Sequence, residues 1–400
     1  MPKIIIDDNK IKELLTRGVE EIFIRESLEK KLRNGKELRI KHGIDPTGEK
    51  IHLGRASLLW KLRQFQELGH KIVLIIGDFT AQIGDPSDKL AKRPFLSEEQ
   101  IKKNMANYKT QVGKILDMEK VELRYNSEWL AKLTFQEIGQ LAEIFTIRQM
   151  MARRNFKERD EKGEEVSLRE FLYPLMQGYD SVAIKADVEI GGFDQLFNLK
   201  AGREIQKFYG QNQQDIMTTQ MLEGTDNRKM STSWENVINI SDNPNEQFGK
   251  IMSMKDELIL KYFLLCTQIS RKEILLIEKG IVSEKLNPRD TKVRLAKEIV
   301  TMYHGAAEAA KAEKEFNKIF RDKGVPSEMP EIKISEKSLA ILDLLVKIKL
   351  ASSKSEAKRL VEGKAVEIDS KIISDWKTAI EIKSGMVIKA GKRKFAKIIL

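Results

Sequence analysis

Residues 43–60 place an acidic side chain, a proline turn and a histidine directly before an apolar helical pattern, in the run GIDPTGEKIHLGRASLLW. His52 lies at the start of the expected helix, where unpaired backbone N–H groups attract anions. Gly54 has no side chain to keep a flat ligand off the helix, and Thr47 offers a hydroxyl to the same space. These residues predict a phosphate site with a histidine donor. Taken alone, such a histidine is more often a helix cap or a surface residue.

A second polar segment, DNRKMSTSWENVI at residues 226–238, has the composition of a loop that stabilises a leaving group. Lys229 stands among small hydroxyl residues, and a mobile lysine beside hydroxyls suits the charge that develops on a departing pyrophosphate. A flexible loop with a capping serine is the plainer interpretation, and this segment by itself would favour it.

A third group of polar residues stands on one face of an apolar helical segment. In REFLYPLMQGYDSVAIKAD, residues 169–187, the spacing of Tyr173, Gln177 and Asp180 is i, i+4 and i+7. Buried polar groups need partners. The spacing therefore indicates either a polar ligand or a structural hydrogen-bond network, with equal weight.

Other common site types are disfavoured. The chain has no G-x-x-x-x-G-K-[ST] motif, and no G-x-G-x-x-G motif follows a strand, which argues against a P-loop ATPase and a dinucleotide oxidoreductase. Four scattered histidines and one cysteine make a zinc cage improbable, so we expect no protein-held metal. Cys266, in the run KYFLLCTQI, is read as a buried apolar thiol.

Two strands and a helix must position the first segment. Residues 38–45 and the almost wholly apolar residues 71–78 are typical of strands, and the helix between them is closed by Gly69 as a cap. A strand, a helix and an apolar strand predict a parallel βαβ unit. Ligands bind beyond the carboxyl ends of such strands, where Asp45 and the Gly77–Asp78 pair stand.

The rest of the chain is predicted to be mostly helical. Residues 97–185 read as helices with an exposed, charged excursion at 153–167, and residues 186–195 read as a strand followed by a turn. Residues 245–320 read as helices without strands, and residues 321–336, with two prolines, are the best linker candidate.

Composition and charge bound the class of protein. A chain of 400 residues predicts two or three domains. The longest apolar run, residues 72–76, is too short to span a membrane, and the N-terminal residues lack the apolar core of a signal peptide. A single cysteine fits a reducing cytoplasm. The net charge of +11 suggests a polyanionic partner, and residues 331–400 hold 16 Lys and Arg against 9 Asp and Glu.

Together, HLGR and KMSTS resemble the two signatures of class I aminoacyl-tRNA synthetases, written HIGH and KMSKS. Residues 169–187 and the run VEIGGFDQ at 188–195 resemble the amino-acid pocket of the tyrosyl-tRNA synthetase family, and GDPSDKLAKR at 84–93 resembles its GDPSGK-type loop. The resemblance implies tyrosine–tRNA ligation from L-tyrosine, ATP with its Mg²⁺, and tRNA(Tyr). It also implies a homodimer formed through a helical insertion around residues 115–170, with no membrane partner.

The resemblance also implies a role for each matching residue. Asp180 would accept the phenol hydroxyl, and Asp45 would lie near the reacting carboxylate. The α-ammonium and backbone of tyrosine would meet Tyr173, Gln177, Asp85 and Gln195. ATP activation would fall to His52, Thr47 and Lys229, with Lys89 and Arg93 holding the pyrophosphate. The remaining ATP contacts would be Gly43, Gly54, Arg55, Gly192, Asp194, Leu222 and Thr232.

Four positions depart from the family pattern. Arg55 replaces the second signature histidine, and it is long enough either to reach a phosphate or to turn to solvent. Lys41 and His42 stand where part of the family has tyrosine and cysteine, the tyrosine being the second partner of the phenol. Thr232 replaces the second signature lysine and removes a cation from the pyrophosphate clamp.

The C-terminal residues resemble an S4 RNA-binding domain. An apolar helix is expected at 338–350, followed by a basic helix that begins with a capping box of Ser353 and Glu356 and ends at Gly363. Short strands are expected after it. Basic residues on one short helix suit a phosphate backbone, although a charge run is more often a solvated face.

The implied fold class is α/β. A Rossmann-like parallel-sheet domain with the dimerisation insertion would span 1–225, an all-α domain with the KMSKS-type loop 226–325, and a small α+β S4-like domain 336–400. Two rival functions stay open. A tryptophanyl enzyme would share the fold, but Asp180 and the S4-like tail argue against it. An RNA-binding protein on a catalytically silent body is supported only by Arg55 and Thr232.

Overall fold

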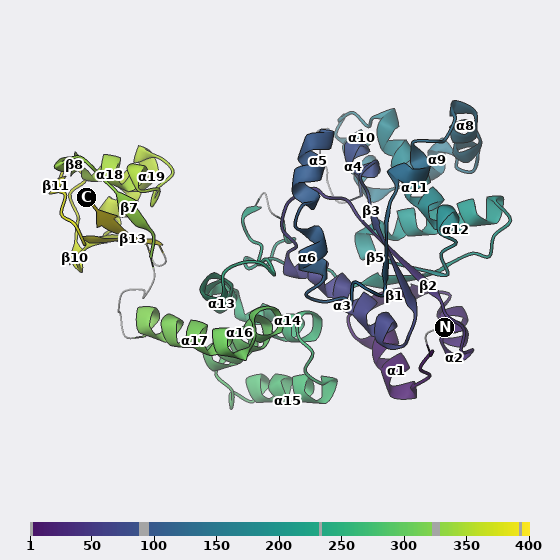
Figure 1. Cartoon of the computed structure of the whole chain (residues 1–400), viewed down its shortest axis with the longest axis horizontal. Coiled ribbons are helices and arrows are strands. Elements are labelled where there is room, and N and C mark those ends of the chain that lie inside the picture. The colour runs from purple at the N-terminus through teal and green to yellow at the C-terminus, as the bar shows by residue number, and fades with distance from the viewer. Residues whose placement is uncertain (1–2, 88–95, 232–233, 322–328, 392–393) are drawn as a thin grey trace. The chain divides into compact units, whose positions relative to one another are not determined.

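The computed structural model describes residues 3–87, 96–231, 234–321, 329–391 and 394–400. They form two compact units, Met1–Ala312 and Glu313–Leu400 (Figure 1). Within these described ranges, every helix is too short or too polar to cross a membrane. The domain boundary predicted near residue 225 stays a prediction. Residues 226–312, which follow it, are part of the first unit.

A six-stranded sheet forms the centre of the first unit, in the order β1-β6-β5-β2-β3-β4. All neighbours in it are parallel except the edge pair of β1 and β6. The two strands predicted at 38–45 and 71–78 are confirmed as β2 and β3. The strands are β1 Val19–Phe23, β2 Arg39–Ile44, β3 Lys71–Ile76, β4 Val121–Tyr125, β5 Val188–Gly192 and β6 Asp215–Thr219.

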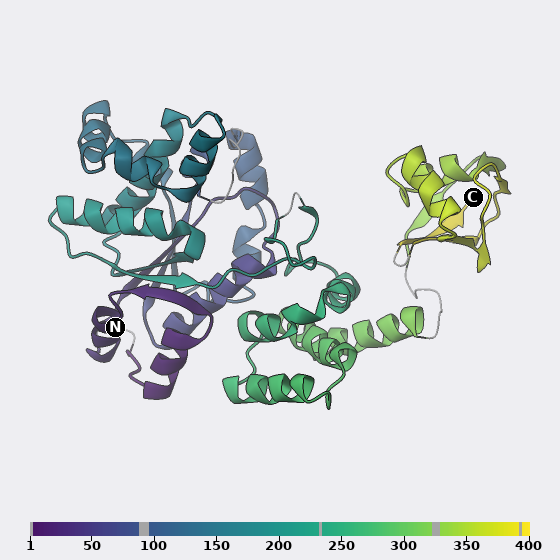
Figure 2. The same cartoon turned by 180° about the vertical axis from the view of Figure 1, so that it is seen from behind.

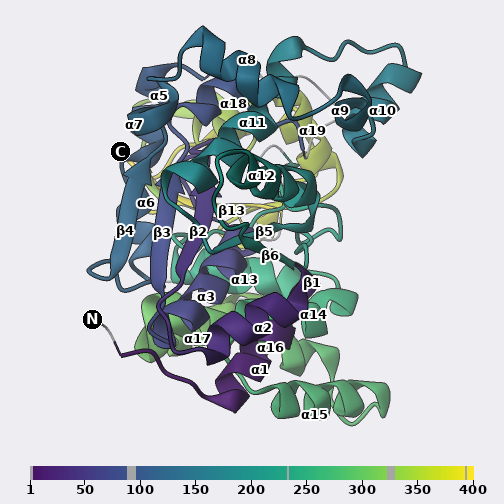
Figure 3. The ribbon, with the colours of Figure 1, turned by 90° about the vertical axis from the view of Figure 1, so that its right-hand side faces the viewer.

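Helices cover both faces of this sheet. Helix α3, Leu53–Glu67, connects β2 to β3, and Gly69 follows it with a φ of +92°, which a residue with a Cβ adopts only with strain. Helices α11, Leu168–Ala183, and α12, Leu196–Phe208, lie on the opposite face (Figure 3). The chain runs outward in opposite directions from β2 and β5, so the crevice beyond their carboxyl ends is the expected place for a ligand.

The stretch predicted as largely helical, residues 97–185, contains a strand. β4 pairs with β3 along its whole length and so belongs to the central sheet. The prediction that the helical insertion starts around residue 115 was therefore wrong. The exposed excursion predicted at 153–167 was wrong for its first half, whereas residues 160–165 are exposed as predicted. Helix α10, Arg154–Glu161, occupies the first half, and the Arg159 guanidinium is buried against the Glu170 carboxylate at 2.7 Å. A buried ion pair holds this charged segment on the protein.

The remaining helices of this unit frame the sheet and continue beyond it. Residues 245–320 are helical without strands, as predicted, and α16 packs against α13 and α14 (Figure 2). Cys266 is buried, and burial raises the pKa of its thiol. The α-helices are α1 Asp8–Thr16, α2 Arg25–Arg33, α4 Thr80–Ile83, α5 Glu98–Met105, α6 Tyr108–Val112, α7 Ser127–Leu130, α8 Phe135–Glu143, α9 Ile147–Met151, α13 Pro244–Ser253, α14 Ile259–Cys266, α15 Arg271–Val282, α16 Pro288–His304 and α17 Ala306–Phe320.

The second unit is a small α+β structure with its own apolar core. Five strands form one sheet in the order β10-β9-β12-β13-β7, and β11 pairs with β8. Two helices, α18 and α19, pack on them. The elements are β7 Glu331–Lys333, β8 Ser338–Ala340, α18 Ile341–Lys347, α19 Lys354–Glu362, β9 Val366–Ile368, β10 Lys371–Ile372, β11 Ala379–Glu381, β12 Val387–Ala390 and β13 Lys394–Ile399.

Three predictions about this unit need correction. The linker cannot extend to residue 336, because β7 pairs in parallel with β13. The first helix begins at Ile341, since Ser338–Ala340 is a strand. Half of the capping box is confirmed: Ser353 Oγ accepts from Glu356 N at 3.2 Å. The Glu356 carboxylate instead accepts from the backbone of Ser352 at 2.7 Å.

Candidate active site

A cavity of about 270 Å³ opens beyond the carboxyl ends of β2 and β5. Its wall includes the ends of both strands, the first turn of α3, one face of α11 and the segment after β6. The cavity therefore lies at the point where the strand order reverses, which the sequence had indicated from Asp45.

The first turn of α3 supplies a neutral imidazole. His52 is the N-cap of the helix, and its Nδ1 accepts from Arg55 N at 3.3 Å, which leaves the proton on Nε2. Burial lowers the pKa of His52 to about 3, so the ring is a hydrogen-bond donor without charge. A Cβ on Gly54 would lie 3.1 Å from the ring, and the missing side chain keeps this space open.

Backbone pairing brings the second signature segment to the first. Leu53 N donates to Ile238 O at 2.8 Å, and Ile240 N donates to Ile51 O at 2.9 Å. These bonds fasten the chain beyond the KMSTS run to the entrance of α3. Two segments that are far apart in the sequence thus meet at one side of the cavity.

Asn236 holds the KMSTS loop in shape. Its Oδ1 accepts from Ser231 N at 2.8 Å, and its Nδ2 donates to Lys229 O at 3.1 Å. Lys229 Nζ lies 3.1 Å from Asp194 Oδ2, in the turn after β5. The lysine is therefore directed across the cavity mouth.

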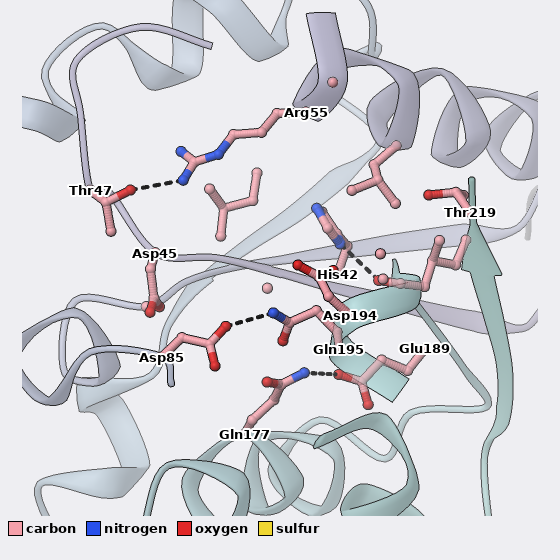
Figure 4. A pocket seen from close by; sticks show the side chains of 18 of the residues that line it. His42, Asp45, Thr47, Arg55, Asp85, Gln177, Glu189, Asp194, Gln195 and Thr219 are labelled. Carbon is pink, nitrogen blue, oxygen red and sulfur yellow. Dashed lines mark hydrogen bonds between the residues drawn. The ribbon is translucent and has the colours of Figure 1, made fainter. Parts of the chain in front are cut away.

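Arg55 is held at the rim of the cavity. Its guanidinium donates to Thr47 Oγ1 at 2.8 Å and to Tyr108 OH at 2.9 Å (Figure 4). Of the two expected orientations, the side chain thus turns toward the predicted phosphate site. A permanent cation beside the Thr47 hydroxyl favours an anionic group there.

The inner end of the cavity carries a carboxylic acid. Asp180 is buried, its Oδ1 accepts from Trp129 Nε1 at 2.8 Å, and its Oδ2 accepts from Asn126 Nδ2 at 3.4 Å. Burial raises the pKa of Asp180 to about 7, and the positive charge of Lys41 opposes this rise. The two donors fix the carboxyl group while its remaining lone pairs stay able to accept.

Asp45 is fixed in a similar way. Tyr173 OH donates to Asp45 Oδ2 at 2.8 Å, and Thr80 Oγ1 donates to Asp45 Oδ1 at 2.7 Å. Tyr173 is on α11 and Asp45 follows β2, so this contact closes one wall of the cavity.

Four amide and carboxylate side chains form a hydrogen-bonded group, and three of them, Asp85, Gln177 and Gln195, line the cavity. Gln195 Nε2 donates to Asp85 Oδ2 at 2.6 Å (Figure 4). Asn198 Nδ2, from α12, lies 3.0 Å from Gln177 Oε1 and 3.1 Å from Gln195 Oε1. Together they present several acceptors, which suits a ligand ammonium group.

The structure gathers the predicted site residues. Every one that falls within the described ranges lines the cavity: Gly43, Asp45, Thr47, His52, Gly54, Arg55, Asp85, Tyr173, Gln177, Asp180, Gly192, Asp194, Gln195, Leu222 and Lys229. Lys89, Arg93 and Thr232 lie outside the described residues. Their shared location supports a common site, while the role of each residue stays a prediction.

Sequence reasoning missed several residues that shape the site. Asn126 and Trp129 follow the unrecognised strand β4, whose alternating VELRY pattern was the available signal. Asn236 gave no signal beyond its place in a polar loop. His42 had been noted only as a departure, and its Nδ1 lies 2.8 Å from Ile190 O on β5.

In the part of the chain that the structure describes, no group of three or more His, Cys, Asp or Glu side chains is arranged to hold a metal ion. At the cavity mouth, the Asp194 carboxylate is engaged with the Lys229 ammonium group of the chain itself.

Two families of known proteins match consecutive parts of the chain. The family described as "tRNA synthetases class I (W and Y)" matches residues 33–321. The family described as "Tyrosine--tRNA ligase SYY-like C-terminal domain" matches residues 322–398. The boundary between the two matches lies just beyond α17.

Curated relatives are similar along nearly their whole length. The "Tyrosine--tRNA ligase" of Moorella thermoacetica is 47% identical over 96% of this chain and 94% of the relative. That of Thermotoga maritima is 47% identical over 96% of each. That of Carboxydothermus hydrogenoformans is 48% identical over 97% of each.

Solved structures share the fold at lower identity. A C-terminally truncated mitochondrial tyrosyl-tRNA synthetase from Aspergillus nidulans superposes with a TM-score of 0.64 at 24% identity, covering 78% of this chain and 94% of that one. The tyrosyl-tRNA synthetase from Archaeoglobus fulgidus, solved with L-tyrosine, gives 0.62 at 23% identity, covering 77% of this chain and all of that one. The predicted α/β fold class is confirmed.

Proposed function

This chain belongs to the class I tRNA synthetases of the tryptophan and tyrosine group, and from that premise we propose that its cavity activates L-tyrosine with ATP and passes it to tRNA(Tyr). The chain is a tyrosine–tRNA ligase. In the first step a tyrosine carboxylate oxygen bonds to the α-phosphorus of ATP. The bond from that phosphorus to the bridging oxygen breaks, and pyrophosphate leaves with the electron pair.

The single observation that carries this assignment is Asp180 at the inner end of the cavity. Trp129 and Asn126 orient its carboxyl group. In this orientation the carboxyl group would accept a hydrogen bond from the hydroxyl of a tyrosine ring. Phenylalanine would leave that buried group unpaired. A site built this way rejects the analogue without the hydroxyl by roughly 10⁴–10⁵-fold. The tyrosyl enzymes are themselves the example from which this magnitude is known.

The wall formed by Tyr173, Gln177, Asp85 and Gln195 would receive the α-ammonium and backbone of tyrosine. Three of them, Gln177, Asp85 and Gln195, are already connected by hydrogen bonds, directly or through Asn198 Nδ2, so little rearrangement is needed when the ligand binds. Asp45, fixed by Tyr173 and Thr80, would lie by the reacting carboxylate. Such preorganisation lowers the entropic cost of bringing tyrosine and ATP together.

The opposite end of the cavity would stabilise the transition state. The Nε2 proton of His52, the Thr47 hydroxyl and the Lys229 ammonium meet there as donors for the developing negative charge. Arg55 adds a fixed cation at the rim. The adenosine would lie along Gly43, Gly54, Gly192 and Leu222, where glycine keeps the backbone accessible. Lys89 and Arg93 would hold the pyrophosphate, and Thr232 would be a further ATP contact.

No side chain is required as a covalent nucleophile, because the tyrosine carboxylate is the attacking group. Mg²⁺ enters as part of the ATP substrate, since it usually binds through substrate phosphates rather than a protein cage. The residues of this chain bind, orient and stabilise charge.

A homodimer is proposed on the basis of an exposed apolar face. Phe135 on α8, Ile147 on α9 and Leu168 on α11 are 91%, 79% and 77% exposed. Large apolar side chains exposed to this extent on neighbouring helices of the sequence favour an interface. They lie in the region after β4, so the dimerisation insertion would run from about residue 126.

The C-terminal unit is proposed as an S4-like RNA-binding domain that contacts the tRNA. Helix α19 presents Lys354, Lys358 and Arg359, and Lys358 Nζ lies 4.4 Å from the ring centre of Trp376. Cations around an aromatic ring suit a nucleic acid, whose backbone attracts the charge and whose bases stack. A cytoplasmic location is proposed from the single buried cysteine and from the substrates.

The experiment that tests the function is amino-acid-dependent ATP–pyrophosphate exchange without tRNA, with tyrosine, phenylalanine and tryptophan in parallel. Exchange with tyrosine alone is the expected result. Exchange with tryptophan would favour the tryptophanyl alternative. If none of the three supports exchange, the catalytic role would be wrong and RNA binding would become the leading function.

A further inference from the structure

A lysine and a glutamate are buried together at the wall of the cavity, which Glu189 lines and Lys41 does not. Lys41 on β2 and Glu189 on β5 are cross-strand partners in the sheet. Their side chains are 0% and 1% exposed, and Lys41 Nζ lies 2.9 Å from Glu189 Oε1. Removing two charges from water costs several kcal/mol for each ion, and apolar replacements of such pairs are often no less stable. Stability alone is therefore a weak reason for this pair.

Every donor of the Lys41 ammonium has an acceptor. Lys41 Nζ lies 2.6 Å from Gln177 O and 2.7 Å from Ser181 Oγ, in addition to Glu189 Oε1. These three acceptors match the three N–H bonds of an ammonium group. Lys41 thus connects two strands of the sheet to the middle of α11.

The Glu189 carboxylate is equally well satisfied. Its Oε1 also accepts from Gln177 Nε2 at 3.1 Å (Figure 4). Its Oε2 accepts from Gln214 Nε2 at 2.5 Å and from Ser181 Oγ at 3.3 Å. The ion pair therefore holds Gln177 twice, by its backbone carbonyl through Lys41 and by its side-chain amide through Glu189.

The pair is next to the part of α11 that faces the amino acid. Gln177 and Asp180 both line the cavity, whereas Lys41 is not among the lining residues described. Ser181, which Lys41 and Glu189 hold, directly follows Asp180. Lys41 would therefore influence a ligand through these neighbours. One route is its positive charge, which lowers the pKa of Asp180.

Helix α12 closes the network from behind. A Cβ on Gly202 would come within 2.6 Å of Gln214 Nε2 and 2.9 Å of Ser181 Oγ, so the helix packs against these groups as closely as glycine permits.

We propose that Lys41 and Glu189 are positioning residues for amino-acid specificity, which fix Gln177 and the turn of α11 that carries Asp180. The inference rests on the proposed function, because it assumes that the cavity holds tyrosine. At the position of Lys41, part of the family has a tyrosine that contacts the phenol directly. In this chain the Lys41–Glu189 pair would act instead through Gln177 and the turn of α11 that carries Asp180.

The test uses the full chain with Lys41→Met and with the double variant Lys41→Met/Glu189→Gln. The double variant removes both charges of the pair, and the amide of Gln214, whose Oε1 has no partner among the described residues, can turn to accept from the new glutamine. Arg159→Met is the matched control. It breaks a second buried ion pair, between Arg159 of α10 and Glu170 of α11, and neither of these residues lines the cavity.

Tyrosine and ATP dependence of pyrophosphate exchange is measured with thermal unfolding in parallel. Lys41→Met should raise the tyrosine KM roughly 10- to 100-fold, the usual effect of losing hydrogen bonds to a charged group, and leave the ATP KM within about twofold. The double variant should recover melting temperature but not the tyrosine KM. Arg159→Met should lower the melting temperature without changing the tyrosine KM.

Three results would overturn the proposal. These are an unchanged tyrosine KM in the double variant, recovery of both properties in it, and an equal rise in the tyrosine KM in Arg159→Met. If Lys41→Met does not fold, the double variant alone decides. Absence of tyrosine-dependent exchange in the unaltered protein would instead refute the proposed function, so the two failures are distinguishable.

Discussion

Lys229 Nζ lies 3.1 Å from Asp194 Oδ2, so the KMSTS loop and the turn after β5 share one ion pair at the cavity mouth. The two side chains are 33% and 25% exposed, and ion pairs this accessible contribute little to stability. The contact matters because it places the lysine beside the space predicted for ATP phosphates. A ligand phosphate would compete with Asp194 for the same ammonium group.

Replacing this lysine should therefore affect catalysis more than folding. Lys229→Ala should lower the kcat of tyrosine-dependent exchange by roughly 10²–10³-fold, the usual effect of losing one transition-state donor, with little change in the tyrosine KM. Lys261→Ala is the matched control, because Lys261 forms an equally exposed ion pair with Glu223 at 2.7 Å outside the cavity. Equal losses of kcat in the two variants would contradict the assignment.

The pKa of Asp180 predicts a pH dependence of tyrosine binding. Burial raises this pKa to about 7, so the empty pocket gains a proton as the pH falls through 7 and loses its charged acceptor. The tyrosine KM should rise toward tenfold per pH unit below this value. His52 should add no step between pH 5 and 8, because its pKa is lowered to about 3.

Exchange rates from pH 5.5 to 8.5 at varied tyrosine provide the measurement. The ATP KM serves as the internal control and should stay nearly constant across the range. In Asp180→Asn the dependence on pH should disappear together with most of the discrimination against phenylalanine. A pH profile that is the same in this variant and in the unaltered protein would assign the titration to another group.

Close packing at Gly77 predicts a sensitive position. A Cβ there would collide with Asp45 Oδ1 and Thr80 Oγ1, which are bonded to each other. Gly77→Ala should lower the free energy of unfolding by about 1–3 kcal/mol and raise the tyrosine KM, because Asp45 is displaced.

Chemical denaturation and exchange kinetics together test this. Gly249→Ala is the control, since Gly249 lies within α13 and a Cβ added to it would have nothing within 4 Å. The free energy of unfolding of that variant should rise by about 0.5–1 kcal/mol, because alanine loses less conformational entropy in a helix than glycine does. If the free energy of unfolding and the tyrosine KM of Gly77→Ala match those of this control, the proposed close packing of Gly77 against Asp45 would be contradicted.

The apolar face of the insertion predicts the oligomeric state. Sedimentation should show a dimer, and the double variant Phe135→Glu/Ile147→Glu should be monomeric because it places charges in a desolvated interface. Val282→Glu, at a residue as exposed as Ile147 but on α15, should remain dimeric. A monomer for the unaltered chain, or a dimer in the double variant, would place the interface elsewhere or remove it.

Deletion of the C-terminal unit should separate the two steps of the reaction. Because β7 is part of the C-terminal sheet, the truncation has to end at Arg321 and not at residue 335. Tyrosine-dependent exchange should remain within about threefold, while charging of tRNA should fall by an order of magnitude or more as phosphate contacts are lost. A parallel loss of both activities would show that the unit is not modular.

The sequence by itself determined the local elements and their chemistry. The strands at β2 and β3, helix α3 with His52 at its start, and the helices after residue 245 follow from hydrophobic periodicity and capping residues, which act between neighbours in the chain. The described residues of the predicted site all line one cavity, because their motifs are short and each is attached to a strand end or a helix start. Resemblance to a family, rather than spacing, distinguished among the functions those motifs allow.

Tertiary structure decided the partners. β7 spans only three residues, and its pairing with β13 makes it a strand where the local pattern favoured a linker. β4 has the alternating pattern of a strand, but it stands in a largely helical stretch, and its pairing with β3 shows that it belongs to the sheet. Arg159, Lys41 and Glu189 are charged residues that local rules place at the surface. Each is buried because a partner from another element meets it, and such compensation between distant residues leaves no trace in the spacing of either one. Asn126, Trp129 and Asn236 shape the site for the same reason: their roles arise from hydrogen bonds that exist only after the chain has folded.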